Sequence, residues 1–84
     1  MTQTYTYHQD PGHGWIEVPG AELDRLGLVE KISRYSYVKG SAVFLEEDCD
    51  ASLWAQAKKA AGEDFATVAS HTNHDSFIRS LPSF

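Results

Sequence analysis

The sequence predicts a single α+β domain over residues 1–84, with a mostly antiparallel sheet, one short helix and one main helix. Two observations carry this prediction. Short segments such as TQTYTYHQ alternate polar and apolar residues, which is typical of strands that bury one face. The longer segment DASLWAQAKKA repeats its apolar residues at helical spacing. A chain of short strands with few helices is typical of a fold in which the helices pack against one face of the sheet.

The first two strands are expected on either side of a turn at residues 10–12, which read DPG. Tyr5 and Tyr7 fall on one side of the first strand, and WIEV forms the second. Asp-Pro-Gly is typical of a type II turn, in which Gly12 would take a positive φ. We expect Gly14 to let the chain enter the second strand without a side-chain clash.

The middle of the chain predicts a short helix and a second hairpin. The helix lies in PGAELDRLGL and ends at Gly27, with a contact between Leu28 and Leu23. KISRYSYVKGSAVFLEE predicts two strands joined at KGS. The continuous apolar run AVFL indicates that the second of these strands is covered on both faces.

The main helix is predicted near residues 50 to 61, started by a cap at Asp48 or Asp50 and closed by Gly62. Its predicted apolar stripe consists of Leu53, Trp54, Ala57, Ala60 and Ala61. Trp15 and Trp54 are expected as core anchors. FATVASH predicts another strand, TNHDS a polar turn, and FIRSL a last strand.

Charge and cysteine content restrict the partner and the compartment. The formal net charge is −5, and the 7 basic residues are scattered, which argues against nucleic acid and favours a protein with a basic surface. The single cysteine, Cys49, allows no internal disulfide and fits a reducing compartment. No segment is predicted to be a secretion signal or to span a membrane, so we expect a cytoplasmic protein. The oligomeric state stays open, a homodimer included.

No motif in the sequence assigns a catalytic residue, a metal or a cofactor. The four histidines, His8, His13, His71 and His74, could hold zinc together with a carboxylate, but their spacing matches no metal motif. EEDCD lacks the ligand positions of a calcium loop. The sequence therefore predicts no cofactor and favours a non-enzymatic protein. A histidine-centred metal-binding protein or hydrolase is the alternative.

The segments DPGHGWIEVP, KISRYSYVKG, VFLEEDCDASLW and HTNHDSFIR together resemble a family of small uncharacterised phage and prophage proteins. That resemblance implies a viral or mobile-element setting and no particular activity. Small phage accessory proteins often bind a host protein, including as inhibitors of host defence. We therefore expect a protein-binding accessory module of the anti-defence type, acting on a host or phage protein.

The expected partner-binding surface combines charge, exposed loops and aromatic side chains. Tyr5, Tyr7, Tyr35 and Tyr37 pair on strand faces, which either belong to the core or form a tyrosine-rich surface. A nucleic-acid mimic would need acidic residues spread over one face, whereas here they concentrate at residues 46–50. The predicted partner-binding residues are Glu46, Glu47, Asp48, Asp50, His13, His74, Tyr35 and Tyr37.

Overall fold

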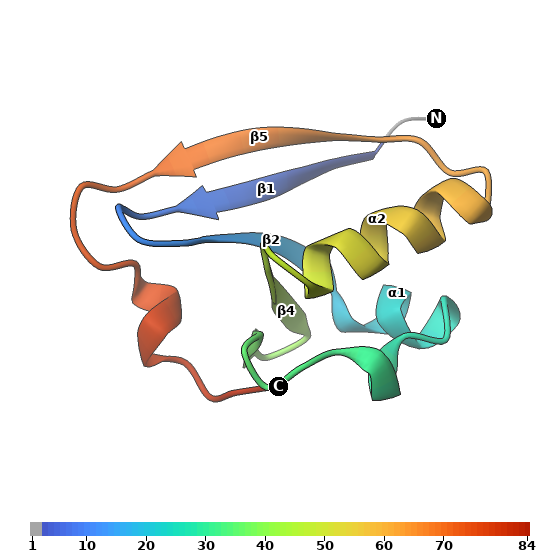
Figure 1. Cartoon of the computed structure of the whole chain (residues 1–84), viewed down its shortest axis with the longest axis horizontal. Helices are drawn as coiled ribbons and strands as arrows, with labels where there is room; N and C mark the ends of the chain where they lie inside the picture. Colours follow the sequence, from blue (N-terminus) through green and yellow to red (C-terminus); the bar gives the residue numbers. More distant parts are fainter. Residues whose placement is uncertain (1–2) are drawn as a thin grey trace.

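The computed structural model describes residues 3–84, which form a five-stranded sheet in the order β3-β4-β2-β1-β5 (Figure 1). The strands are β1 (Gln3–Gln9), β2 (Gly14–Pro19), β3 (Tyr37–Lys39), β4 (Ala42–Glu46) and β5 (Phe65–His71). The helices are α1 (Gly20–Arg25) and α2 (Asp50–Ala60), with short 3-10 turns η1 (Val29–Lys31) and η2 (Phe77–Ser80). Strands β1 and β5 are parallel and the other neighbours antiparallel. The predicted α+β class with a mostly antiparallel sheet is confirmed.

The β1–β2 hairpin is confirmed, although its turn differs from the prediction. Tyr7 pairs with Ile16 in the antiparallel register, and a Cβ on Gly14 would collide with the Tyr7 ring. The positive φ predicted for Gly12 is wrong. The Asp10 carboxylate instead holds the turn, because its Oδ1 accepts hydrogen bonds from the backbone N–H of Gly12 (3.0 Å) and of His13 (2.9 Å).

Two other local predictions are confirmed. Gly27 has a φ of 71° and ends α1, and the Leu28 N–H donates to the Leu23 carbonyl at 2.8 Å, as in a Schellman end. Strand β4 lies between β3 and β2, and its three central residues, Val43 to Leu45, are buried. Its continuous apolar run is explained by this position inside the sheet.

The long strand predicted before the KGS loop is wrong for residues 31–36. β3 begins only at Tyr37, and the preceding residues form a turn in which the Ser36 N–H donates to the Ser33 carbonyl at 3.3 Å. The turn is fixed by Asp50, whose Oδ2 accepts from the hydroxyls of Ser33 (2.7 Å) and Ser36 (2.5 Å). Tyr35 therefore lies outside the strand and does not share a strand face with Tyr37.

Helix α2 lies where the sequence predicts it, but neither aspartate caps it. The cap residue is Cys49, without a side-chain cap, and the Glu46 carboxylate accepts from the N–H of Asp48 (2.9 Å) and of Cys49 (3.1 Å). Gly62, with a φ of 72°, closes the helix as predicted.

The buried side of α2 differs from the predicted stripe. Trp54 is buried as predicted, but Ala60 and Ala61 are exposed. Lys58 is buried instead, and its Nζ lies 2.6 Å from Glu22 Oε1 and 3.1 Å from Glu63 Oε1. It also donates to the Tyr5 hydroxyl at 3.0 Å. Burial alone would lower the pKa of Lys58, yet these partners hold that pKa above its usual value.

The core has two parts, one on each face of the sheet. The larger lies under α2 and contains Tyr5, Ile16, Val18, Leu23, Leu28, Ile32, Val43, Leu45 and Trp54. The smaller lies on the opposite face and contains Trp15, Phe44 and Ile78. Both tryptophans are therefore core anchors, as predicted.

The predicted last strand at FIRSL is wrong, because Phe77–Ser80 forms η2. The Ser76 hydroxyl caps this turn by accepting from the Ile78 N–H at 3.3 Å, and Asp10 Oδ2 accepts from the Ser76 N–H at 3.0 Å. Within residues 3–84, no helix has the length and apolar character needed to cross a membrane.

Candidate partner-binding pocket

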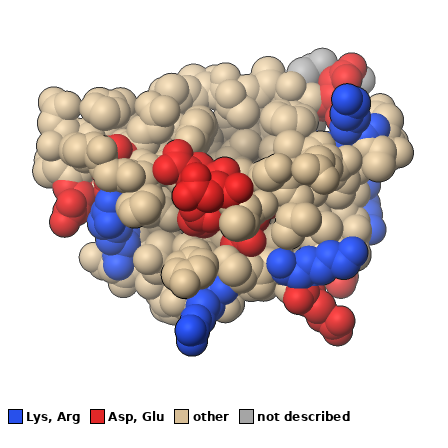
Figure 2. All heavy atoms as spheres, viewed as in Figure 1, with Lys and Arg blue, Asp and Glu red and all other residues tan. Residues whose placement is uncertain are grey.

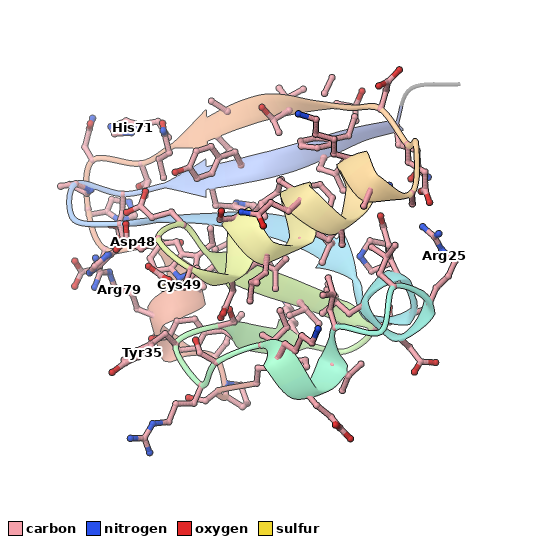
Figure 3. The ribbon with its side chains drawn as sticks, turned by 45° about the vertical axis from the view of Figure 1, so that its right-hand side comes forward. Arg25, Tyr35, Asp48, Cys49, His71 and Arg79 are labelled. Atoms are coloured by element: carbon pink, nitrogen blue, oxygen red, sulfur yellow. The ribbon has the colours of Figure 1, made fainter. Side chains whose placement is uncertain are left out.

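An open cavity of about 350 Å³ lies where the first hairpin, the start of α2, the turn before β3 and η2 meet. Figure 3 shows four of its side chains, Tyr35, Asp48, Cys49 and Arg79, on one side of the molecule, far from Arg25. We call this cavity the aromatic–acidic pocket. It is lined by His13, Trp15, Tyr35, Tyr37, Glu46, Asp48, Cys49 and Arg79.

Aromatic rings and one guanidinium line part of the pocket. Trp15 is buried, and its ring centroid lies 6.3 Å from that of Tyr37 and 6.0 Å from that of His13. The Arg79 guanidinium carbon lies 5.5 Å from the centroid of a Trp15 ring. This stacking places the Arg79 charge against the indole face, where a cation is attracted by the ring quadrupole.

The positive charge of Arg79 is already paired with Asp10. Arg79 Nε lies 2.5 Å from Asp10 Oδ2, and Nη2 lies 2.9 Å from Oδ1. Arg79, followed by the backbone N–H groups of Ser76, His13 and Gly12, holds the pKa of the Asp10 carboxyl well below its usual range. The pair is therefore ionised at neutral pH, and Arg79 brings little net positive charge to the pocket.

Carboxylates line the mouth of the pocket. Glu46 is half-buried and held by the two N–H groups at the start of α2, while Asp48 is exposed. Figure 2 shows acidic side chains gathered near the middle of this face, beside the start of α2. Because Arg79 is neutralised, the mouth presents a net negative charge.

Glu47 lies beside the pocket and bonds to the first hairpin. Its Oε2 accepts from the Tyr7 hydroxyl at 2.8 Å, and its Oε1 lies 3.9 Å from His13 Nδ1. Burial, followed by the hydrogen bond to Glu47, raises the pKa of Tyr7 to about 12. Glu47 therefore adds charge near the pocket and ties the segment before α2 to β1 through its hydrogen bond with Tyr7.

Asp50 is not part of the exposed acidic surface that the sequence predicts. Its side chain is 1% exposed, and its carboxylate accepts from the Ser33 backbone N–H as well as from two serine hydroxyls. It supports the turn that carries Tyr35, which is 69% exposed at the rim. Asp50 therefore shapes the pocket from behind instead of facing a partner.

The predicted histidines are dispersed, and only His13 lines the aromatic–acidic pocket. His8 lies on the sheet face opposite α2, with Nε2 2.8 Å from Glu17 Oε1. His71 ends β5, and His74 bonds locally in the following loop, with Nδ1 3.1 Å from the Asp75 carbonyl. No group of three or more His, Cys, Asp and Glu residues in the described chain could hold a metal ion.

Five of the eight residues predicted for partner binding line one cavity in the structure. The aromatic–acidic pocket brings together His13, Tyr35, Tyr37, Glu46 and Asp48, whereas Glu47 lies beside it and His74 outside. Sequence reasoning missed Trp15, Cys49 and Arg79 as lining residues. Arg79 reaches the first hairpin only in the folded chain, and no local sequence pattern predicts that contact.

Comparisons with protein-family models, with curated proteins and with solved structures found no match to this chain.

Proposed function

We propose that this chain is a non-enzymatic protein-binding module, and that the aromatic–acidic pocket receives an arginine or lysine side chain of a partner protein. The observation that carries this proposal is the meeting of two carboxylates, Glu46 and Asp48, with the rings of Tyr35 and Tyr37 around one cavity. Carboxylates form charge-assisted hydrogen bonds with guanidinium and ammonium groups, and aromatic faces attract the same cations.

The surroundings of the pocket support a basic ligand. Asp10 neutralises Arg79 through two contacts of 2.5 and 2.9 Å, so that an incoming cation meets little repulsion from it. The chain as a whole carries a formal net charge of −5, which would steer a basic surface toward it. Tyr35 at the rim supplies a rigid aromatic contact of the kind enriched at interfaces.

The resemblance to small phage proteins suggests where the partner is found. We propose a cytoplasmic host protein with a basic surface, on which this chain acts as an accessory inhibitor of the anti-defence type. Electrostatic steering would make association fast at low salt, and salt would slow it because exposed charges are screened beyond about 8 Å at physiological ionic strength.

The proposal is tested by photo-crosslinking from two exposed positions. A photoreactive phenylalanine analogue replaces Tyr35 at the pocket rim, and in a second variant it replaces Phe77, which is 50% exposed but does not line the pocket. We expect the Tyr35 position to capture a partner at a segment containing arginine or lysine. We expect Phe77 not to capture that partner.

A matched pair of substitutions then tests the charge. Asp48→Asn should abolish capture from position 35, while Asp24→Asn, the same change at an exposed position of α1, should leave it intact. Equal capture by both variants, or equal capture from positions 35 and 77, would contradict the proposal.

A further inference from the structure

Strand β5 is an outer strand with unusual exposure. Its seven residues, FATVASH, contain no Lys, Arg, Asp, Glu or Pro, and every residue from Ala66 to His71 is exposed. Val68, an apolar β-branched residue, is 57% exposed. In Figure 1, β5 forms the upper margin of the sheet, and in Figure 2 the same margin lacks charged side chains along most of its length. Such an uncharged edge is a template for pairing with another strand.

The opposite edge of the sheet is protected in ways that β5 is not. Strand β3 has only three residues, one of them the charged Lys39. The C-terminal segment also covers it, because Tyr37 forms a bridge with Ser83 and the Val38 N–H donates to the Pro82 carbonyl at 2.9 Å. Within residues 3–84, the outer side of β5 pairs with no strand. Short length, charge and cover are the usual protections of an edge, and β5 has none of them.

The hydrogen-bond register between β5 and β1 shows which backbone groups of β5 point away from the sheet. The Thr72 N–H donates to the Gln9 carbonyl at 2.9 Å, directly after the parallel register that pairs His71 with Gln9. Because backbone groups alternate sides along a strand, even-numbered residues bond toward β1. The N–H and C=O groups of the odd-numbered residues, Phe65, Thr67, Ala69 and His71, therefore point away from the sheet.

We propose that β5 pairs antiparallel with β5 of a second copy of this chain, about a two-fold axis at Val68. In this register Thr67 of one copy lies opposite Ala69 of the other, and Phe65 lies opposite His71. All outward groups are then paired in about eight backbone hydrogen bonds. Val68 of one copy faces Val68 of the other at a non-hydrogen-bonded position, where side chains approach closely.

A second copy is the occupant that the strand itself favours. The outward groups of β5 belong to its odd-numbered residues, and antiparallel pairing about Val68 places odd-numbered residues of the two copies opposite each other, as an isologous interface requires. No like charges meet along the strand, although each chain carries a formal net charge of −5. No β5 residue lines the aromatic–acidic pocket, so pairing leaves both pockets open. The proposal therefore does not depend on the proposed function.

The expected dimer is weak and reversible. Pairing through one strand buries less than about 1,200 Å² in total, which is the range of transient contacts. The test is sedimentation equilibrium of the full chain from micromolar to millimolar concentration, where we expect a monomer–dimer equilibrium. A monomer at every concentration would overturn the proposal.

Substitutions at Val68 test the register. Val68→Glu and Val68→Lys should each weaken self-association about tenfold or more, because like charges meet at the two-fold axis. An equimolar mixture of the two variants should restore dimers as heterodimers. The controls are Val29→Glu and Val29→Lys, the same changes at a valine that is 42% exposed in η1, and they should leave the dimer intact. Equal effects at both positions, or no rescue on mixing, would rule out this interface.

Hydrogen exchange tests the same β5–β5 interface without any substitution. Exchange of the outward amides of Thr67 and Ala69 should slow as protein concentration rises. The Val68 amide, which faces β1, should be protected at all concentrations. An outward amide whose exchange is independent of concentration, in a sample that sedimentation shows to be dimeric, would place the contact elsewhere.

Discussion

Arg79 in η2 and Asp10 in the first turn form a two-point ion pair between segments far apart in the sequence, with Nε 2.5 Å from Oδ2 and Nη2 2.9 Å from Oδ1. The same carboxylate accepts from the Ser76 N–H at 3.0 Å. This pair fastens the C-terminal segment to the β1–β2 hairpin. It also holds Arg79 against Trp15 and so completes the floor of the aromatic–acidic pocket.

The first prediction concerns the pH dependence of this pair. Because the folded-state pKa of Asp10 lies well below its usual value, its contribution is full above the unfolded pKa of about 3.9 and is lost as pH falls toward the folded pKa. Asp10→Asn should lower the melting temperature at neutral pH, and the gap to wild type should narrow below about pH 4. Thermal unfolding at several pH values measures the difference in melting temperature between Asp10→Asn and wild type, with Asp24→Asn as control. A gap that stays constant down to low pH would contradict the assignment.

The second prediction concerns the buried Lys58. Lys58→Met removes the nearer cation of the buried Glu22 carboxylate, whose other cation, Arg25, lies 3.8 Å away, and should lower the free energy of unfolding by about 3–5 kcal/mol. Adding Glu22→Leu should recover most of this loss, because no unpaired charge then stays buried. Chemical denaturation measures both. Lys59→Met, at an exposed neighbour, should change stability by less than about 0.5 kcal/mol. Equal losses at both lysines would refute the buried pair.

The third prediction concerns Tyr7. Its pKa of about 12 should fall when Glu47→Gln removes the carboxylate that accepts its hydroxyl, although burial keeps that pKa above 10.0. Since the folded pKa is raised, the contribution of Tyr7 to stability is present below about pH 10 and is lost as pH rises toward 12. Ultraviolet titration measures the pKa, with Tyr7→Phe to identify the signal. An unchanged high-pH transition in Glu47→Gln would contradict the contact.

The fourth prediction concerns Gly14. An alanine Cβ would collide with the Tyr7 ring, so Gly14→Ala should lower the free energy of unfolding by about 1–3 kcal/mol. Gly12→Ala is the comparison, because its Cβ would lie within 3 Å of one atom only, Arg79 Nη2 at 2.8 Å, whereas a Cβ on Gly14 would lie within 3 Å of three atoms of the Tyr7 side chain. Gly12→Ala should lower the free energy of unfolding by less than Gly14→Ala does. Denaturation of the two variants side by side decides, and the reverse order would show that the ring is not packed there.

Elements with local signals could be predicted from the sequence. Gly27 and Gly62 mark the ends of α1 and α2, and the run AVFL marks a strand inside the sheet. The turn at residues 33–36 could not be predicted, because it depends on hydrogen bonds to Asp50 across 14 and 17 residues of chain. The alternation in SRYSY is equally compatible with a strand, and a tertiary contact decides against it.

The residues of the aromatic–acidic pocket divide in the same way, into those with a local signal and those placed by a tertiary contact. Exposed aromatic and acidic residues such as Tyr35 and Asp48 can be singled out by type and by their place in loops or at a helix start. Arg79 could not be singled out from the sequence, because it reaches the pocket only through its pairing with Asp10, 69 residues away in the sequence. The prediction of an exposed Asp50 is wrong, because an acidic cluster at a helix start does not show which of its members is buried.

The most direct test of the central claim is a nuclear magnetic resonance titration of the aromatic–acidic pocket with blocked arginine amide. Blocked citrulline amide, which has the same shape without the charge, is the matched ligand. We expect arginine, and not citrulline, to shift the Trp15 indole and the amides of Asp48 and Cys49. Asp48→Asn should weaken the shifts and Asp24→Asn should not. Equal shifts with both ligands, or shifts that Asp48→Asn leaves unchanged, would contradict a pocket for a basic side chain.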